Sequence, residues 1–318
     1  MTNPTLEIVI EDEDTLEALE DAGLADRTED AAAEITGGPG TISPKPVVNV
    51  TQGTEHETIQ SAVDDAEEGD TIEVKSGTYY ESVDIDVDSL TLEGPNAGIH
   101  ADSEDRGAEA TITDGVFVDE NPSNVVIDGL AIERTVGEAE GVVQVGSTSN
   151  PGANDLTIRN NVITAESDGP QNLGTILIEH IDGEIQIEDN LLTQTGDGDG
   201  DAPVRGLVEA VQLENTEIVV DGNTVETDVG VAPSGFSGPS PEYTITDNEF
   251  VENDIGVLVF GSYDADELQA FEDNSFTGAE GTTYVSDQDD QLDLRQVQDD
   301  NQFDPSAVID EDNNLVPE

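Results

Sequence analysis

One short sequence motif recurs along this chain and constrains its fold more than any other feature. It consists of an aliphatic residue, two polar residues, an asparagine, one variable residue and a further apolar residue. The five copies have this asparagine at Asn161, Asn190, Asn223, Asn248 and Asn274, and an earlier copy has Leu130 in its place. From Leu130 onward, the steps between copies are 31, 29, 33, 25 and 26 residues. Periods of this size predict stacked rungs that share one long core.

Each copy is predicted to form a strand, a bend and a second strand. Apolar and polar residues alternate before the bend, as in Ile185, Gln186 and Ile187. This period of two indicates that one face of the strand is buried and the other is hydrated. The bend itself consists of Asp, Asn and Gly, which tolerate left-handed backbone angles and bond their own main chain.

The asparagine at a fixed place has a physical explanation in a parallel coil. The same bend lies one rung above the last, so the side-chain amides stack and each one donates and accepts hydrogen bonds. We therefore expect an internal asparagine ladder, with Asn161 at its end beside Leu130. The alternative is that five turn asparagines recur by coincidence in an acidic protein, which the solenoid period disfavours.

A short helix is predicted just before the first rung. Residues 58–67 place Ile59, Ala62, Val63 and Ala66 on one apolar stripe. Thr71 to Val74 then has the pattern of a strand. A helix in this position would cover the open end of the coil, which otherwise exposes the core and the unpaired backbone.

Several segments resemble the opening of pectin-lyase-like right-handed parallel β-helix proteins. They are Thr58–Val63, Glu68–Ile72, Ser76–Glu81 and Leu90–Ile99, and with the later asparagine rungs the resemblance covers about residues 50–280. It implies an all-β fold, a right-handed single-stranded parallel β-helix with an N-terminal capping helix. The family includes pectate lyases, polygalacturonases, pectin methylesterases, viral tail spikes and non-catalytic surface proteins, so it specifies the fold more closely than the activity.

The two ends of the chain depart from the rung pattern. Residues 1–45 are predicted to be a separate acidic N-terminal arm, with helix-like spacing from Asp14 to Ala33, that either docks to another subunit or stays solvated. Residues 46–284 are predicted to be the β-helix, and its asparagine rung to fade after about residue 280. Residues 285–318 are predicted to be a C-terminal cap, closed by Leu292, Leu294, Val297, Phe303 and Val308.

The charge balance is extreme, with 75 acidic residues against 8 basic ones and a formal net charge of −67. Self-repulsion is severe at ordinary ionic strength. It is screened to a range of about 3 Å near 1 M salt, so the composition fits a protein that works in molar salt. The alternating strands exclude an acidic disordered chain. Nucleic acid is excluded as a partner because phosphate binding needs Lys and Arg.

Other composition features concern the environment of the chain. There are no cysteines, so neither disulfides nor thiolate metal sites are expected. The first residues lack the basic and apolar regions of a signal peptide, so we expect no standard export, and no segment is predicted to insert into a membrane. A virion component that is made in the cytoplasm and released by lysis needs no export signal.

A search for catalytic sets finds none that is complete. A pectate-lyase-like site would need clustered Asp ligands for calcium and an arginine base. Arg134 and Arg159 lie near successive corners and are candidate neighbours, although ion pairing with nearby carboxylates is the favoured explanation for them. The polygalacturonase and methylesterase motif sets are absent. Carboxylate pairs suited to glycoside hydrolysis arise by chance among 75 acids, and the best local cluster is Glu179 to Asp182, with His180.

Three long loops, 147–152, 195–201 and 234–239, are predicted to leave the same corner of the coil and to form a binding flank. In the second loop, Asp197, Asp199 and Asp201 are candidate ligands for Ca²⁺ or Mg²⁺, the alternative being a flexible acidic loop. No cofactor is required by any motif. Phe236, Tyr243 and Tyr263 are the candidate platforms for stacking against a glycan.

The resulting hypothesis is a non-catalytic structural or adhesive protein, a virion appendage or capsid decoration of a halophilic virus. We expect a homo-oligomer, either a trimer or a five-fold ring, in which residues 1–45 bind other virion proteins and the coil contacts host surface glycan. The alternative function is a polysaccharide lyase or glycoside hydrolase acting on an acidic exopolysaccharide. The alternative location is the cytoplasm or cell surface of a halophilic archaeon.

Overall fold

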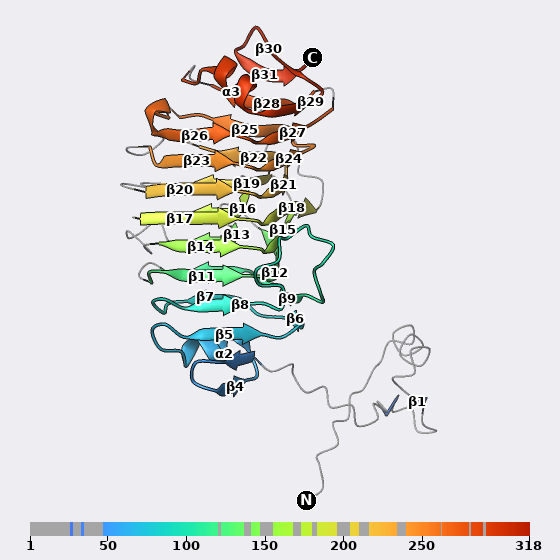
Figure 1. Ribbon diagram of the computed structural model, residues 1–318. Helices are drawn as coiled ribbons and strands as arrows, with labels where there is room; N and C mark the ends of the chain where they lie inside the picture. Colours follow the sequence, from blue (N-terminus) through green and yellow to red (C-terminus); the bar gives the residue numbers. More distant parts are fainter. Residues whose placement is uncertain are drawn as a thin grey trace, which may run out of the picture. The chain divides into compact units, whose positions relative to one another are not determined.

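The computed structural model describes most of the chain after residue 46 (Figure 1). The described residues are 26–27, 33–34, 47–119, 122–136, 141–146, 155–167, 173–179, 183–195, 204–209, 216–233, 240–261, 263–279, 281–288 and 291–318. The chain divides into two compact units, Met1–Pro44 and Lys45–Glu318.

In the first unit, the structure describes the two short strands β1 (Asp26–Arg27) and β2 (Ala33–Glu34), which form one antiparallel pair. The rest of the helix expected from Asp14 to Ala33 lies outside the described residues, so the helix stays a prediction.

The second unit is a parallel β-solenoid made of three long sheets, as the sequence predicts. Sheet I contains, from the N-terminal end, β4 (Thr54–His56), β3 (Val47–Asn49), β5 (Thr71–Val74), β8 (Thr91–Glu93), β11 (Val125–Asp128), β14 (Leu156–Arg159), β17 (Gly183–Glu188), β20 (Thr216–Asp221), β23 (Glu242–Thr246) and β26 (Leu268–Glu272). Sheet II contains β6 (Gly77–Tyr79), β9 (Ala110–Ile112), β12 (Ala131–Val136), β15 (Val162–Ser167), β18 (Leu191–Thr195), β21 (Thr224–Glu226), β24 (Glu249–Val251), β27 (Ser275–Thr277) and β29 (Gln302–Asp304). Sheet III contains β7 (Val83–Ile85), β10 (Val116–Val118), β13 (Gly141–Val145), β16 (Leu173–Ile178), β19 (Val204–Glu209), β22 (Val229–Ala232), β25 (Ile255–Val259), β28 (Thr283–Asp287), β31 (Asn314–Pro317) and β30 (Ala307–Ile309).

The core lies inside the three sheets and is built from the alternation seen in the sequence. In β17, Ile185 and Ile187 are fully buried, and they align with the buried Ile218 and Val220 of β20. A shift of the pairing by one residue would turn these side chains to solvent, so the alternation fixes the register of each rung.

The corner from sheet I to sheet II has a constant construction. From β11 onward, each sheet I strand is joined to the next sheet II strand by two residues. The first residue of the pair has a positive φ in every described copy: Gly129, Asn160, Asp189, Gly222, Asp247 and Asp273. Asn, Asp and Gly adopt this left-handed backbone more readily than other residues, which explains the choice of residue before the ladder position.

The second residue of each corner forms the predicted asparagine ladder. The Nδ2 of Asn190 donates to Asn223 Oδ1 (3.0 Å) and to the Ile158 carbonyl (2.8 Å). Its Oδ1 accepts from the backbone N–H of Asn161 (3.0 Å) and from that residue's Nδ2 (3.2 Å). The same pattern of bonds repeats at Asn161, Asn223, Asn248 and Asn274. All of these amides are buried, so each bond satisfies a group that water does not reach.

The ladder is one member longer than predicted. At one end the N–H of Leu130 donates to Asn161 Oδ1 (3.0 Å), as expected. At the other end Asn301 accepts from the N–H and the Nδ2 of Asn274 (3.0 and 2.9 Å). The prediction that the rung fades near residue 280 is therefore wrong. The signal was present, because Asp300 to Phe303 repeats the pattern of Asp273 to Phe276, but a helix precedes it instead of a strand.

The N-terminal end of the coil is closed by a helix and a hairpin. The helix α2 (Ile59–Asp64) buries Ile59, Ala62 and Val63, and the Thr58 side chain accepts from the N–H of Ser61 at its start. The antiparallel strands β3 and β4 extend sheet I beyond β5. Because β3 runs antiparallel to β5, this edge differs from the parallel rungs that follow.

The C-terminal end is closed by α3 (Leu294–Asp300) and by the antiparallel strands β31 and β30. Leu294 and Val297 are buried in the cap, and Leu292 and Phe303 pack against the core. Val308 is 38% exposed, so its predicted capping role is wrong. It lies in the middle of a three-residue strand, between the inward-facing Ala307 and the half-buried Ile309.

One long insertion, which was not predicted from the sequence, interrupts the constant corner. Residues 94–109, here called the strap, join β8 to β9. The strap bonds to corner residues of three later rungs: Arg106 donates to the Asn160 carbonyl (2.8 Å), the Ala101 N–H to the Asp189 carbonyl (3.0 Å), and His100 Nε2 lies 2.7 Å from the Gly222 carbonyl. It therefore braces successive rungs along the ladder corner.

We expect Asn190→Leu to lower the melting temperature more than Asn161→Leu, because Asn190 has amides on both sides and Asn161 has one only on one side. Each buried donor left without a partner costs about 1–3 kcal/mol, and 1 kcal/mol corresponds to roughly 2–4 °C in a unit of this size. Thermal unfolding of both variants in the same molar-salt buffer measures the difference. Equal losses of melting temperature in the two variants would contradict the prediction that an asparagine at the end of the ladder stabilises the fold less than one inside it.

Candidate functional site

The connections between strands vary in length at some corners of the coil and are constant at others. The corners on both sides of sheet III vary in length, whereas the ladder corner keeps two residues apart from the strap. Loops 147–152 and 234–239 connect sheet III to sheet I, but loop 195–201 connects sheet II to sheet III. The prediction that all three leave one corner is therefore wrong. Each of the three loops therefore connects a strand of sheet III to a strand of another sheet.

The outer face of sheet III carries an apolar cluster that is separate from the main core. It contains the buried Val229, Ala232 and Leu258, with Ile255 and Phe260 packed against them. Apolar side chains on the outside of a strand need cover from other groups, so their burial distinguishes this face from an ordinary hydrated one.

Arg205 lies on the same face. It pairs in register with Val229, and its guanidinium carbon lies 5.5 Å from the centre of the Phe260 ring. Its Nε has no hydrogen-bond partner within the described residues, and burial lowers the pKa of the guanidinium. A partly buried cation next to an aromatic ring suits a carboxylate-bearing ligand, because the guanidinium donors match carboxylate geometry.

A polar pair lies on earlier strands of the same sheet. Gln144 of β13 donates from Nε2 to Glu179 Oε2 (2.9 Å), and Glu179 is 7% exposed. Glu179 belongs to the predicted cluster of Glu179 to Asp182, of which the other members lie outside the described residues. Glu179 and Arg205 are thus an acidic and a basic group beside the described part of sheet III, which also carries the exposed Asp84 of β7.

The predicted aromatic platforms are not surface groups. Tyr243 is fully buried and Tyr263 is 1% exposed, and their rings meet edge to face with centroids 6.1 Å apart. The Tyr263 hydroxyl donates to the Pro241 carbonyl (3.0 Å). Their role as glycan contacts is therefore wrong: Tyr243 occupies an inward position of β23, where the rung needs a large apolar side chain. Phe236 lies outside the described residues.

The candidate cation ligands Asp197, Asp199 and Asp201 also lie outside the described residues. Within the part of the chain that the structure describes, no group of three or more His, Cys, Asp or Glu side chains is arranged to hold a metal ion. Nor does any described helix have the length and apolar character needed to cross a membrane.

The two arginines considered as lyase bases do not come together. Arg134 is in sheet II, where it lies 4.9 Å from the Phe117 ring centre and donates to the Gly141 carbonyl (2.8 Å). Arg159 is in sheet I, where its Nε pairs with Asp128 (2.8 Å). The ion-pairing alternative is therefore the correct account of Arg159.

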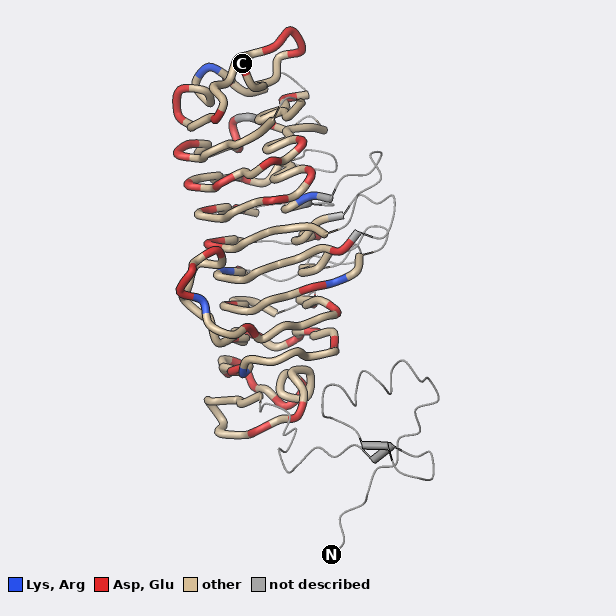
Figure 2. The backbone as a smooth tube through the Cα atoms, turned by 90° about the vertical axis from the view of Figure 1, so that its right-hand side faces the viewer, with Lys and Arg blue, Asp and Glu red and all other residues tan. Residues whose placement is uncertain are grey.

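Two groups of carboxylates, separated by Arg159, lie along the end of sheet I beside the ladder corner. Register pairs Glu73 with Glu93, Glu93 with Asp128, and Glu188 with Asp221, about 4.8 Å apart from strand to strand. Burial, then repulsion from Asp128 and Glu73, raises the pKa of Glu93. Acidic segments recur at the turns along the solenoid (Figure 2). The fold thus places like charges at rung spacing, which explains physically why salt should stabilise it.

Comparison with protein-family models, with curated proteins and with solved structures gives no match for this chain. The candidate site is therefore defined by the geometry of this chain alone.

We expect Glu188→Gln to stabilise the fold at neutral pH in low salt. Burial, then Asp221 and Asp189, raises the pKa of Glu188, so its ionised form destabilises the folded state. This penalty is present above the raised pKa and is lost as the pH falls through it. Thermal unfolding of wild type and variant at several pH values and salt concentrations measures the gain, which should shrink in acid and in molar salt. Glu226→Gln is the control, because Glu226 is exposed on β21 of sheet II and pairs in register with the neutral Thr193 of β18. A gain independent of pH would contradict the account.

The loop that contains Asp197, Asp199 and Asp201 is still predicted to bind a cation. Because three carboxylates alternate with glycine, we expect Ca²⁺ to bind, with heat detectable by calorimetry in high salt that is lost in Asp199→Ala. If the wild-type chain gives no heat of Ca²⁺ binding, the prediction of a cation site in this loop is wrong.

Proposed function

We propose that this chain is a non-catalytic structural β-helix of the pectin-lyase-like type that serves as an appendage or capsid decoration on the virion of a halophilic virus. In this proposal residues 1–45 bind other virion proteins, and the outer face of sheet III contacts an acidic glycan on the host surface. The protein would act as a trimer or a five-fold ring. The alternative location is the cytoplasm or surface of a halophilic archaeon.

The continuous asparagine ladder is the observation that supports this proposal most. It runs from Leu130 to Asn301 with caps at both ends of the coil, a construction suited to a rigid projecting body. The engagement of Arg134 and Arg159 in internal contacts favours a structural role over a lyase in which either acts as a free base.

The charge of the chain supports the proposal that the protein works in a halophilic environment. A formal net charge of −67, with carboxylates stacked at rung spacing, favours a working environment in which salt screens repulsion. Arg205 beside Phe260 supports the glycan contact, since a guanidinium and an aromatic ring together suit an acidic sugar. The enzyme alternative rests on the fold alone, and release of oligosaccharides from an acidic glycan by the purified chain would favour it.

We expect deletion of residues 1–45 to abolish binding to particles and self-association while leaving the solenoid folded. Sedimentation in molar salt measures association, and circular dichroism with thermal unfolding checks the fold. The matched control replaces residues 1–45 by a Gly/Ser linker of equal length. Assembly of the deleted chain to the same extent as wild type would contradict the role of the arm.

A further inference from the structure

The C-terminal edge of sheet I differs from the edges of the other two sheets. Sheet II continues through β29, and sheet III through β31 and β30, but sheet I ends at β26. In the following turn α3 precedes the corner residue Asn301, so a helix takes the place of the next sheet I strand. A helix is about 10–12 Å wide, whereas strands in a sheet are about 4.8 Å apart. The replacement therefore leaves a gap along β26.

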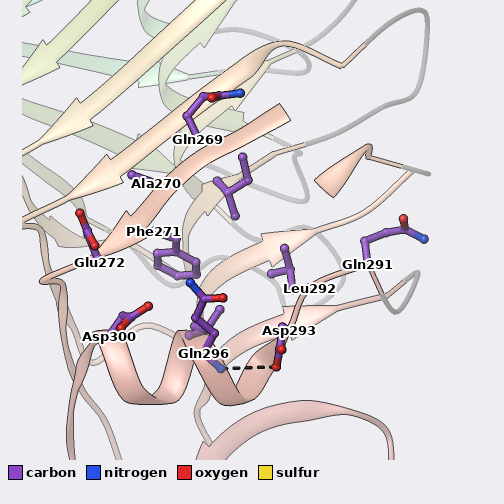
Figure 3. Close-up of a pocket in the computed structure, with 11 residues that line it drawn as sticks. Gln269, Ala270, Phe271, Glu272, Gln291, Leu292, Asp293, Gln296 and Asp300 are labelled. Carbon is purple, nitrogen blue, oxygen red and sulfur yellow. Dashed lines mark hydrogen bonds between the residues drawn. The ribbon is translucent and has the colours of Figure 1, made fainter. Parts of the chain in front are cut away.

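This gap is a cavity of about 250 Å³ between β26 and α3 (Figure 3). Its apolar lining is Leu268, Phe271, Leu292 and Val297, with Gln269 and Gln296 at the rim. The volume is sufficient for one or two aliphatic side chains, and the same lining includes the carboxylates Glu272, Asp293 and Asp300.

The two halves of β26 differ in what occupies their outer edge. Near its end, the Phe271 carbonyl accepts from Asn301 Nδ2 (2.9 Å), and the N–H of Asp273 donates to the Asp300 carbonyl (2.8 Å). Leu268 to Ala270 lie beside the cavity instead. A strand that pairs here continues sheet I by one more member, with its inward side chains in the apolar cavity.

The chain itself contains a segment with the sequence of a sheet I strand outside the solenoid. Glu7 to Asp12 has the sequence EIVIED, and Glu184 to Asp189, which includes most of β17, has EIQIED. The two differ only at Val9, which corresponds to the outward-facing Gln186. Ile8 and Ile10 correspond to Ile185 and Ile187, both fully buried in sheet I. The segment thus has the alternation that sheet I requires.

We propose that Glu7–Asp12 of a second copy binds as a strand along Leu268–Ala270 of β26, with Ile8 and Ile10 directed into the cavity. The proposal rests on the assembly role of the arm in the proposed function and names the surface that receives it. In sheet I, the chain enters the solenoid at β3, at the end opposite to β26. Such a head-to-tail contact closes into a ring when the rotation between copies permits, which suits a trimer or a five-fold ring.

The donor segment is itself acidic, with Glu7, Glu11 and Asp12. Bringing it to an acidic partner is unfavourable at low ionic strength and becomes favourable when salt screens the repulsion. Association through this contact therefore increases with salt concentration, the reverse of a contact held by ion pairs.

The chain has no cysteine, so single cysteines allow a direct test. Full-length Val9→Cys and Gln269→Cys are mixed in molar salt and treated with a short bismaleimide. We expect a cross-linked species of two chains joined between these positions, identified by mass spectrometry of the peptides. Gln302→Cys replaces Gln269→Cys in the control, because it is equally exposed on β29, the last strand of sheet II.

A second pair of variants tests the apolar anchors. Ile8→Asp/Ile10→Asp should reduce the cross-link yield at least about tenfold. Val9→Asp should change self-association much less. It is measured by sedimentation, because residue 9 is the cross-linking position. Cross-linking at Gln302 as strong as at Gln269, or no effect of the Ile8/Ile10 pair, would overturn the proposal. So would a Val9→Cys/Gln269→Cys double variant that cross-links only within one chain. If deletion of residues 1–45 abolishes assembly but no Gln269 cross-link forms, this docking site is wrong and the arm's proposed role stands.

Discussion

The column of buried amides beside sheet I is the interaction on which the rest of the structure depends. Each asparagine joins its own corner to the next through backbone and side-chain hydrogen bonds, so the position of one rung fixes the position of its neighbour. A two-residue corner with a left-handed first residue recurs at the five asparagines from Asn161 to Asn274, whose amides are all buried. The regular sheets, the apolar interior and the aligned carboxylates follow from this stacking.

The strict ladder corner also explains where variation is tolerated. Insertions lie at the corners beside sheet III, and the only long insertion at the ladder corner among the described residues is the strap, which bonds back to the corner it interrupts. An apolar cluster lies on the outer face of sheet III, and a cavity with both apolar and acidic lining residues lies at the C-terminal end of sheet I.

The sequence predicted the fold well because period-two alternation and the recurring asparagine are local signals. The same reasoning misplaced Tyr243 and Tyr263, since their position near the later loops suggested surface platforms although both side chains are buried in the core. It also missed Asn301, because a helix stands where the pattern has a strand. The site on sheet III depends on which distant strands become neighbours, such as those of Arg205 and Phe260, and no local pattern contains that information.

Hydrogen exchange of backbone amides in molar salt tests the ladder most directly. The N–H groups of Asn161, Asn190, Asn223, Asn248 and Asn274 lie in bends, yet each donates to the side chain of the next ladder member. They should exchange as slowly as the N–H groups of the central strands, through global unfolding alone. Exchange at the rate of ordinary turn amides, while the strands remain protected, would contradict the amide column as the spine of the fold.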